Sequence, residues 1–271
     1  MRASSEASLK AAADRWEPVL AEAGESARDL AESIFAVVDA LDSSASLRRA
    51  LTDPARPADA KASLTQGLLG AKAPDAVVDL VAGMSRSRWS ADDDLASALE
   101  EIGTTSLLAA AESRGELERV EDELFRLGRS LIGARELRIA LSNRELPVEN
   151  RVALVDALLE GKVAPETELL VRRAATSMRE RSVPNAIAHV GELAAARRRR
   201  LVAAVTAAVP LTQGQLTRLG EILERAYGRS VQINVGIDPE VVGGLRVQVG
   251  AEVVDATVLT KLEEARRRLA G

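Results

Sequence analysis

Apolar residues recur every three or four positions over long stretches of this chain. One such series consists of Leu117, Val120, Leu124, Leu127 and Leu131. This spacing places the five side chains on one face of a helix with 3.6 residues per turn, so it predicts an amphipathic helix packed against a core. Gly115 separates this helix from the one before it.

Prolines indicate where two further helices begin. Pro147 suits the first position of a helix, where its missing N–H costs nothing, and Glu149 then lies near the positive end of the helix dipole. Pro57 and Asp59 stand in the same relation earlier in the chain. Because short helices are marginal on their own, we expect them to pack together as compact helical bundles.

From residue 201 onward the period of the apolar residues changes to two. The alternating sets are Leu201, Ala203, Val205, Ala207 and Val209, then Val231, Ile233, Val235 and Ile237, then Leu245, Val247 and Val249. A period of two predicts β-strands. Leu216, Leu219 and Leu223 predict a helix between the first two strands, and a final helix is expected to reach Leu269. The predicted fold class is therefore mostly α with a small C-terminal α/β module of strand-helix-strand-strand-helix order.

The first two thirds of the chain contain an internal duplication. Residues 46–53 (SLRRALTD) align without a gap with residues 136–143 (ELRIALSN), a shift of 90, and the same shift superimposes Phe35 on Phe125. A period this long indicates duplicated domains rather than the units of a solenoid. We therefore expect three domains, which are an extra N-terminal helical bundle over residues 1–92, a second bundle over residues 93–198 and an α/β domain over residues 199–271.

The composition excludes several kinds of chemistry. The chain has no cysteine and a single histidine, His189, so disulfides, thiolate catalysis and clusters of His or Cys metal ligands are excluded. Trp16 and Trp89 are expected to pack in the core. The net charge of −5 disfavours general affinity for nucleic acid.

No apolar run approaches the ~20 residues that a membrane span requires, and no signal peptide is recognised, so the cytoplasm is the expected location.

The charge is divided unevenly along the chain. Residues 197–271 contain 12 Lys+Arg and 8 Asp+Glu, which leaves 24 Lys+Arg and 33 Asp+Glu for residues 1–196. The net charges are +4 and −9, a division that suggests two modules with different neighbours.

A glycine pair near the C-terminus raises the question of a phosphate site. Gly243 and Gly244 follow Asp238-Pro239, but the apolar pattern predicts that they lead into a strand, whereas a phosphate loop leads into a helix N-terminus. Neither the Walker pattern nor G-x-G-x-x-G is present. We interpret the residues of this region as structural, with a turn at Asp238 and Pro239, tight backbone at Gly243, Gly244 and Gly250, and a helix cap at Asp255 or Thr257.

The order of these segments resembles a known family. Residues 206–211 (TAAVPL), a helix, residues 237–244 (IDPEVVGG), residues 247–257 (VQVGAEVVDAT) and a closing helix are similar to the delta subunit of bacterial rotary ATP synthases, related to the mitochondrial oligomycin-sensitivity-conferring protein. Residues 137–143 (LRIALSN), followed by Pro147, resemble the N-terminal bundle of that family. The usual family member covers roughly residues 93–271, and the additional bundle over residues 1–92 resembles the duplication of actinobacterial members.

The resemblance implies a non-catalytic stator subunit without a cofactor or metal. Its helical bundle would bind the N-terminal helix of a head alpha subunit, and its C-terminal module would hold the b-type helices of the peripheral stalk, so that the head does not turn with the rotor. Other head subunits would be neighbours. The subunit would lie at the cytoplasmic face of the plasma membrane, attached to the membrane only through the complex.

The sequence leaves two other functions open, and one of them depends on a run of four arginines. Arg197, Arg198, Arg199 and Arg200 are interpreted as the cationic end of a helix, with contact to an acidic stalk helix as a further possibility. A basic tail of this kind also suits a helical adaptor that binds nucleic acid or another complex, although no aromatic residues are interleaved to stack on bases. A nucleotide-binding enzyme that uses the strand-helix-strand unit is the other alternative.

Overall fold

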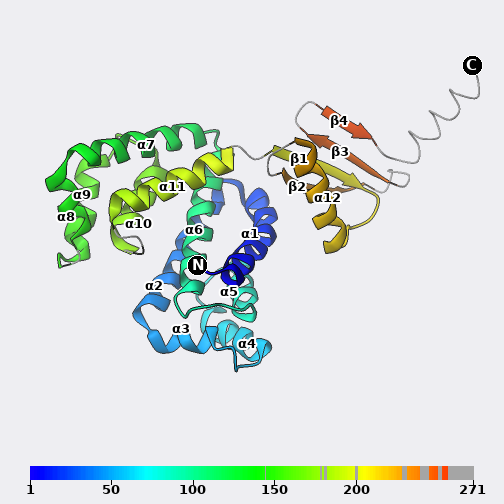
Figure 1. Cartoon of the computed structure of the whole chain (residues 1–271), viewed down its shortest axis with the longest axis horizontal. Coiled ribbons are helices and arrows are strands. Elements are labelled where there is room, and N and C mark those ends of the chain that lie inside the picture. Colours follow the sequence, from blue (N-terminus) through cyan, green and yellow to red (C-terminus); the bar gives the residue numbers. More distant parts are fainter. Residues whose placement is uncertain are drawn as a thin grey trace, which may run out of the picture. The chain divides into compact units, whose positions relative to one another are not determined.

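A computed structural model describes residues 1–143, 145–177, 179, 182–198, 201–227, 231–238, 244–249 and 252–255. The chain divides into two compact units, residues 1–195 and residues 196–271 (Figure 1). The first is the helical unit and the second is the C-terminal unit. The prediction of a mostly helical protein with a small C-terminal α/β module is confirmed.

The helical unit repeats its elements with the period found in the sequence. The first series is α1 (Ala3–Ala23), a 3₁₀ turn (Gly24–Ser26), α2 (Ala27–Ser43), α3 (Ala45–Thr52), α4 (Ala58–Leu69) and α5 (Asp75–Arg86). The second series is α6 (Asp94–Ser113), α7 (Leu117–Gly133), α8 (Arg135–Ser142), α9 (Val148–Leu159), α10 (Pro165–Ser177) and α11 (Val183–Arg198). The bounds of α7, α8 and α9 are those of α2, α3 and α4 shifted by 90.

Local sequence accounts for several of the helix ends. Ser44 accepts a hydrogen bond from the backbone N–H of Leu47 at 3.2 Å and so caps the start of α3. Gly115 has φ of 72°, and the N–H that follows it, on Glu116, bonds to the carbonyl of Ala111 at 2.8 Å. This left-handed glycine closes α6 as expected. Pro57 and Pro147 immediately precede α4 and α9.

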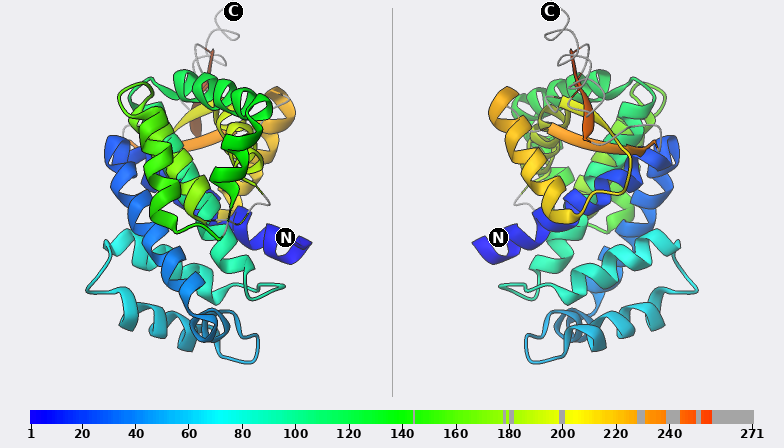
Figure 2. Two further views of the ribbon diagram at one scale, coloured as in Figure 1. Left: turned by 90° about the vertical axis from the view of Figure 1, so that its left-hand side faces the viewer. Right: turned by 90° about the vertical axis from the view of Figure 1, so that its right-hand side faces the viewer.

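Helix α6 contributes to two hydrophobic cores. Leu95, Leu99 and Ile102 belong to the cluster built from α1 to α5, whereas Leu107 and Leu108 belong to the cluster built from α7 to α11. Helices α3 and α4 of the first series (light blue to cyan) and α7 to α9 of the second (green) lie toward opposite ends of the helical unit, while α2 lies beside α6 (Figures 1 and 2). The two copies are therefore joined by one continuous helix, and the domain boundary at residue 92 stays a prediction.

Helices α1 and α6 run parallel and in register. The hydroxyl of Ser5 donates to the Asp94 carboxylate at 2.6 Å, and the indole N–H of Trp16 donates to the Ser106 hydroxyl at 2.9 Å. Residues one period apart thus lie side by side along the two helices. Trp16 and Trp89 are both buried, as predicted, and Trp89 donates to the carbonyl of Met84.

The C-terminal unit contains a four-stranded sheet. Its elements are β1 (Leu201–Ala207), α12 (Gln213–Tyr227), β2 (Val231–Ile237), β3 (Leu245–Val249) and β4 (Glu252–Asp255). The strand order is β2-β1-β3-β4, with β2 parallel to β1 and β3 and β4 each antiparallel to its neighbour. Ala203, Val205 and Ala207 of β1 are buried, so the predicted alternation is correct there.

The sheet has one strand more than the predicted strand-helix-strand-strand-helix order. Residues 252–255 pair with β3 as an antiparallel edge strand, because two short β-rich segments close together in sequence satisfy their backbone groups in a hairpin. The predicted closing helix to Leu269 lies outside the described residues.

Candidate functional site

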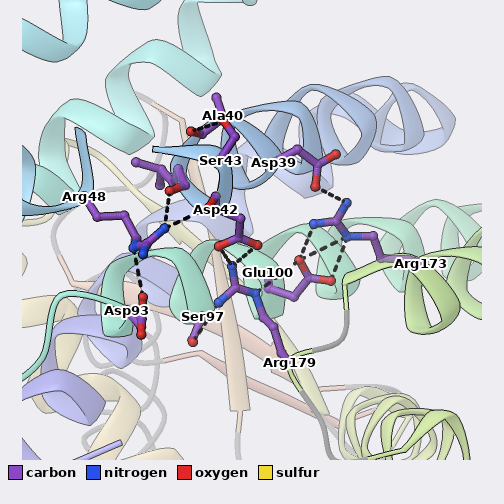
Figure 3. A network of polar contacts seen from close by, with 11 residues as sticks. Asp39, Ala40, Asp42, Ser43, Arg48, Asp93, Ser97, Glu100, Arg173 and Arg179 are labelled. Carbon is purple, nitrogen blue, oxygen red and sulfur yellow. Dashed lines mark hydrogen bonds and ion pairs between the residues drawn. The ribbon is translucent and has the colours of Figure 1, made fainter. Parts of the chain in front are cut away.

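Charged side chains join α2, α6 and α10 in the middle of the helical unit (Figure 3). The guanidinium of Arg173 on α10 donates to both carboxylate oxygens of Glu100 on α6, at 2.8 Å from Nε and 2.7 Å from Nη2. Its Nη1 donates to Asp39 on α2 at 2.7 Å. A two-point arginine–carboxylate contact fixes orientation as well as distance, so Arg173 holds three helices in one arrangement.

A second arginine, just beyond α10, makes matching contacts. Arg179 donates to both oxygens of Asp42 at the end of α2, at 2.5 and 2.7 Å, and to the hydroxyl of Ser97 on α6 at 3.1 Å (Figure 3). Arg48 of α3 donates to the last carbonyls of α2, Leu41 and Asp42, and pairs with Asp93 at 2.9 Å. The network thus links α2 and α3 of the first copy to α10 of the second.

The ion pair between Arg173 and Glu100 is largely buried. The side chains of Arg173 and Glu100 are only 10% and 14% exposed. Burial opposes the charge on Arg173, but hydrogen bonds and attraction from Glu100 and Asp39 outweigh it and raise the pKa of this arginine. Loss of one partner would leave the other charge buried and unpaired, which is why such pairs enforce one geometry even where their net contribution to stability is small.

An apolar depression of about 260 Å³ lies beside the network. Its lining consists of Glu32, Phe35, Ala36, Asp39, Leu107, Leu169, Arg172, Arg173 and Thr176. The guanidinium of Arg173 lies 4.6 Å from the centre of the Phe35 ring, a cation–π contact. With an apolar floor and charges of both signs around it, the depression can accept a few side chains of a partner helix.

The described residues offer no cluster for metal binding. No group of three or more His, Cys, Asp or Glu side chains in the described ranges could hold a metal ion. His189 is half exposed on α11, 3.9 Å from Glu101, whose pKa is raised by burial and lowered less by His189. No helix in the described part of the chain is both long and apolar enough to cross a membrane.

The residues singled out in the C-terminal unit lie in turns and at strand ends. The N–H of Asp238 donates to the carbonyl of Ala207 at 2.9 Å, which extends the pairing of β1 and β2. Gly244 has φ of 88° and leads directly into β3, so the helix N-terminus that a phosphate loop requires does not follow it. Asp255 is the last residue of β4. Pro239, Gly243 and Gly250 lie outside the described residues.

The arginine run lies where α11 ends. Arg197 is buried and Arg198 is exposed, while Arg199 and Arg200 lie outside the described residues. A charged last turn suits the negative end of the helix dipole. The contact with a stalk helix stays a prediction for these arginines.

Sequence reasoning missed the network around Arg173. Glu100 and Arg173 are 73 residues apart, and Asp39 and Arg173 are 134 apart, so no local period connects them. The available signal was the duplication itself, because Arg173 stands where the first copy has Gly83. A charge that appears in only one copy indicates a contact that only that copy makes.

Comparison with known proteins relates the whole chain to one family. The family model for the ATP synthase delta (OSCP) subunit matches residues 104–269. ATP synthase subunit delta of Streptomyces coelicolor is 45% identical over 100% of this chain and 98% of the relative. The same subunit of Kineococcus radiotolerans is 44% identical over 98% and 96%, and that of Thermobifida fusca is 43% identical over 89% and 90%.

These matches cover both copies of the helical bundle. The family model begins within α6, whereas the Streptomyces relative aligns along the first copy as well. The predicted resemblance, including its actinobacterial type, is confirmed. The chain therefore belongs to the ATP synthase delta (OSCP) subunit family and is a non-catalytic stator subunit of the ATP synthase.

Proposed function

We propose that the helical unit attaches to the N-terminal helix of a head alpha subunit and that the C-terminal unit holds the b-type helices of the peripheral stalk. The subunit then prevents the head from turning with the rotor. The uneven distribution of charge along the chain supports this assignment of two partners. Residues 1–196 have a net charge of −9, whereas residues 197–271 have a net charge of +4. Surfaces of opposite sign select different partners and steer their approach.

The apolar depression is the proposed contact for the alpha helix. The exposed Ala36 and the half-buried Leu169 provide apolar surface above the buried Phe35 and Leu107. Asp39, with its side chain 62% exposed, leaves carboxylate surface for a cation. An amphipathic helix can bind such a groove by inserting its apolar residues, so neither partner needs a catalytic or reactive group. The surrounding ion pairs keep the groove in one shape, which reduces the ordering cost of binding.

The arginine run is the proposed contact for the stalk. Arg198 is exposed at the end of α11, and Arg197, Arg199 and Arg200 flank it in sequence. We also propose that residues 1–92, 93–198 and 199–271 act as three functional segments. The complex would hold the subunit at the cytoplasmic face of the plasma membrane, with the other head subunits nearby.

A filling substitution in the depression tests the alpha assignment. In Ala36→Arg, a long charged side chain replaces a methyl group that lines the depression, so binding to the head should fall while binding to the b helices is retained. Ala40→Arg is the matched control, one turn further along the exposed side of α2 and outside the lining. The measurement is recovery of alpha and b subunits with the tagged full-length chain from detergent-solubilised membranes. Equal recovery of alpha by both variants would reject the assignment.

A further inference from the structure

The outer surface of α7 and α8 exposes three large apolar side chains. Phe125 is 63% exposed, Ile132 is 70% exposed and Ile139 is 54% exposed. On α7, Phe125, Arg129 and Ile132 follow one another at spacings of four and three, so they share one face of the helix. This face lies about a third of a turn around the helix from the buried series that includes Leu124 and Leu131. We call Phe125, Arg129, Ile132 and Ile139 the α7–α8 surface.

The first copy of the bundle shows that the fold does not require an apolar residue at two of these positions, those of Ile132 and Ile139. The 90-residue shift places Phe125, Ile132 and Ile139 on Phe35, Asp42 and Arg49. Asp42 and Arg49 are charged and exposed, although α2 and α3 have the same bounds, once shifted, as α7 and α8. The same helices therefore form with charged residues at these positions, and the apolar residues of the second copy need another explanation.

The first copy also shows what such a surface binds when it is covered. Phe35 is only 8% exposed, because Arg173 of α10 stacks on its ring and α6 packs beneath it. One and two turns further along α2, the acidic Asp39 and Asp42 pair with Arg173 and Arg179. The covered phenylalanine is thus followed by carboxylates that meet arginines of α10 and of the segment just after it.

On the second copy neither of these two positions is acidic, since Ile132 stands in the place of Asp42. Arg129 stands in the place of Asp39, and its guanidinium lies 5.8 Å from the Phe125 ring. Between residues 125 and 139 the chain has four arginines, Arg126, Arg129, Arg135 and Arg138, and a single acidic residue, Glu136. Of these arginines, Arg126 already pairs at 3.0 Å with Asp122, one turn earlier on α7. A helix that covers this surface as α10 covers α2 must therefore provide carboxylates where α10 provides arginines.

We propose that the α7–α8 surface binds an acidic amphipathic helix of another subunit of the ATP synthase. The apolar side of that helix covers Phe125, Ile132 and Ile139, and its carboxylates pair with the surrounding arginines. The site is separate from the depression beside α10 and concerns a different partner contact.

Site-specific photocrosslinking in the assembled enzyme tests this proposal. The full-length chain carries p-benzoylphenylalanine in place of Ile132, and the control carries it in place of Arg49, the exposed position one period before Ile139. The expected result is a crosslink from position 132 to a helical segment of another subunit that is rich in Asp and Glu. A crosslink to a second copy of the chain or to a basic segment would overturn the proposal, as would no crosslink in an enzyme that is otherwise fully assembled.

A charge reversal provides the second measurement. Arg126→Glu/Arg129→Glu should weaken retention of the crosslinked subunit by about ten-fold at low salt, and the difference should shrink as salt screens the charges. Both positions are exposed, so the melting temperature of the free chain should stay close to that of the parent. Unchanged retention in a folded variant would overturn the proposal. Because Ala36→Arg tests the depression separately, failure of one assignment leaves the other standing.

Discussion

The helical unit and the C-terminal unit differ in how much core each has. Two large clusters of buried apolar residues, joined at α6, fill the helical unit. In the C-terminal unit the buried apolar side chains among those described are Ala203, Val205, Ala207, Leu223 and Val247. A small unit buries a smaller share of its surface and is correspondingly marginal. The comparison predicts a stable helical unit and a C-terminal unit that responds strongly to small changes.

The largest effect is expected from Leu99→Ala. Leu99 is fully buried on α6, in the core of the first copy, and its loss leaves a cavity where close-packed helices cannot collapse. The free energy of unfolding should fall by about 3 kcal/mol. Urea denaturation followed by tryptophan fluorescence measures it, because Trp16 and Trp89 both lie in the helical unit. A loss below about 1 kcal/mol would mean that this core is loosely packed.

A pair of glycine substitutions should give effects of opposite sign. In Gly103→Ala, the new Cβ would lie 2.6 Å from the Phe35 ring, so the ring must move away from α6 and its contact with Arg173 is disturbed, at a cost of about 2 kcal/mol. Gly83→Ala is the control, a helical glycine with no atom within 4 Å of the added Cβ. It should gain up to about 1 kcal/mol from helix propensity. Thermal unfolding of both variants gives the measurement, and a gain for both would mean that Phe35 is not tightly held.

Gly244→Val tests the C-terminal unit. A β-branched residue at φ of 88° is strained by about 1–2 kcal/mol, which is a large fraction of the stability of a small unit. Amide hydrogen exchange in β1 and β3 should accelerate, whereas exchange in α6 should stay unchanged. Protection of β3 equal to that of the parent would show that Gly244 tolerates a side chain.

The smallest effect concerns Lys61, which is buried on α4. Burial lowers its pKa, and attraction from Asp53 only partly compensates. Between the lowered pKa and the ordinary value for lysine, the unfolded chain binds more protons than the folded chain, so the free energy of unfolding rises as pH rises through this window.

The control for Lys61 comes from the second copy, where Arg151 is buried at the equivalent position. Arginine stays charged throughout, so Lys61→Arg should remove the rise in stability that is expected below the ordinary pKa of lysine. Lys61→Met should remove it as well. Urea unfolding at several pH values gives the measurement, and a slope that persists in both variants would have to come from another group.

Local patterns predicted the elements of this fold well. The series from Leu117 to Leu131 predicted α7, and the alternation from residue 201 predicted the buried face of β1, because both depend only on which neighbours along the chain face the core. The duplication predicted that the second copy repeats the helices of the first. These predictions need no knowledge of which elements pack together.

Contacts between distant residues were not predicted. The sequence interpretation began the second bundle at residue 93, where α6 starts, and did not foresee that α6 belongs to both cores. Buried residues such as Leu99 and Leu108 lie on opposite faces of that helix, so its pattern is not that of one amphipathic side. The pairing of Arg173 with Glu100 and Asp39 depends on how three helices come together, which a single sequence does not reveal.

The shared helix α6 has a mechanical consequence. A force applied to one copy reaches the other along twenty residues of unbroken helix rather than through a linker. Bending the two copies relative to each other would therefore compress one closely packed core against the other, and protein interiors have low compressibility. Because the two copies share a helix, the duplication lengthens the bundle without adding a hinge. We therefore expect the longer bundle to transmit load as one rigid body.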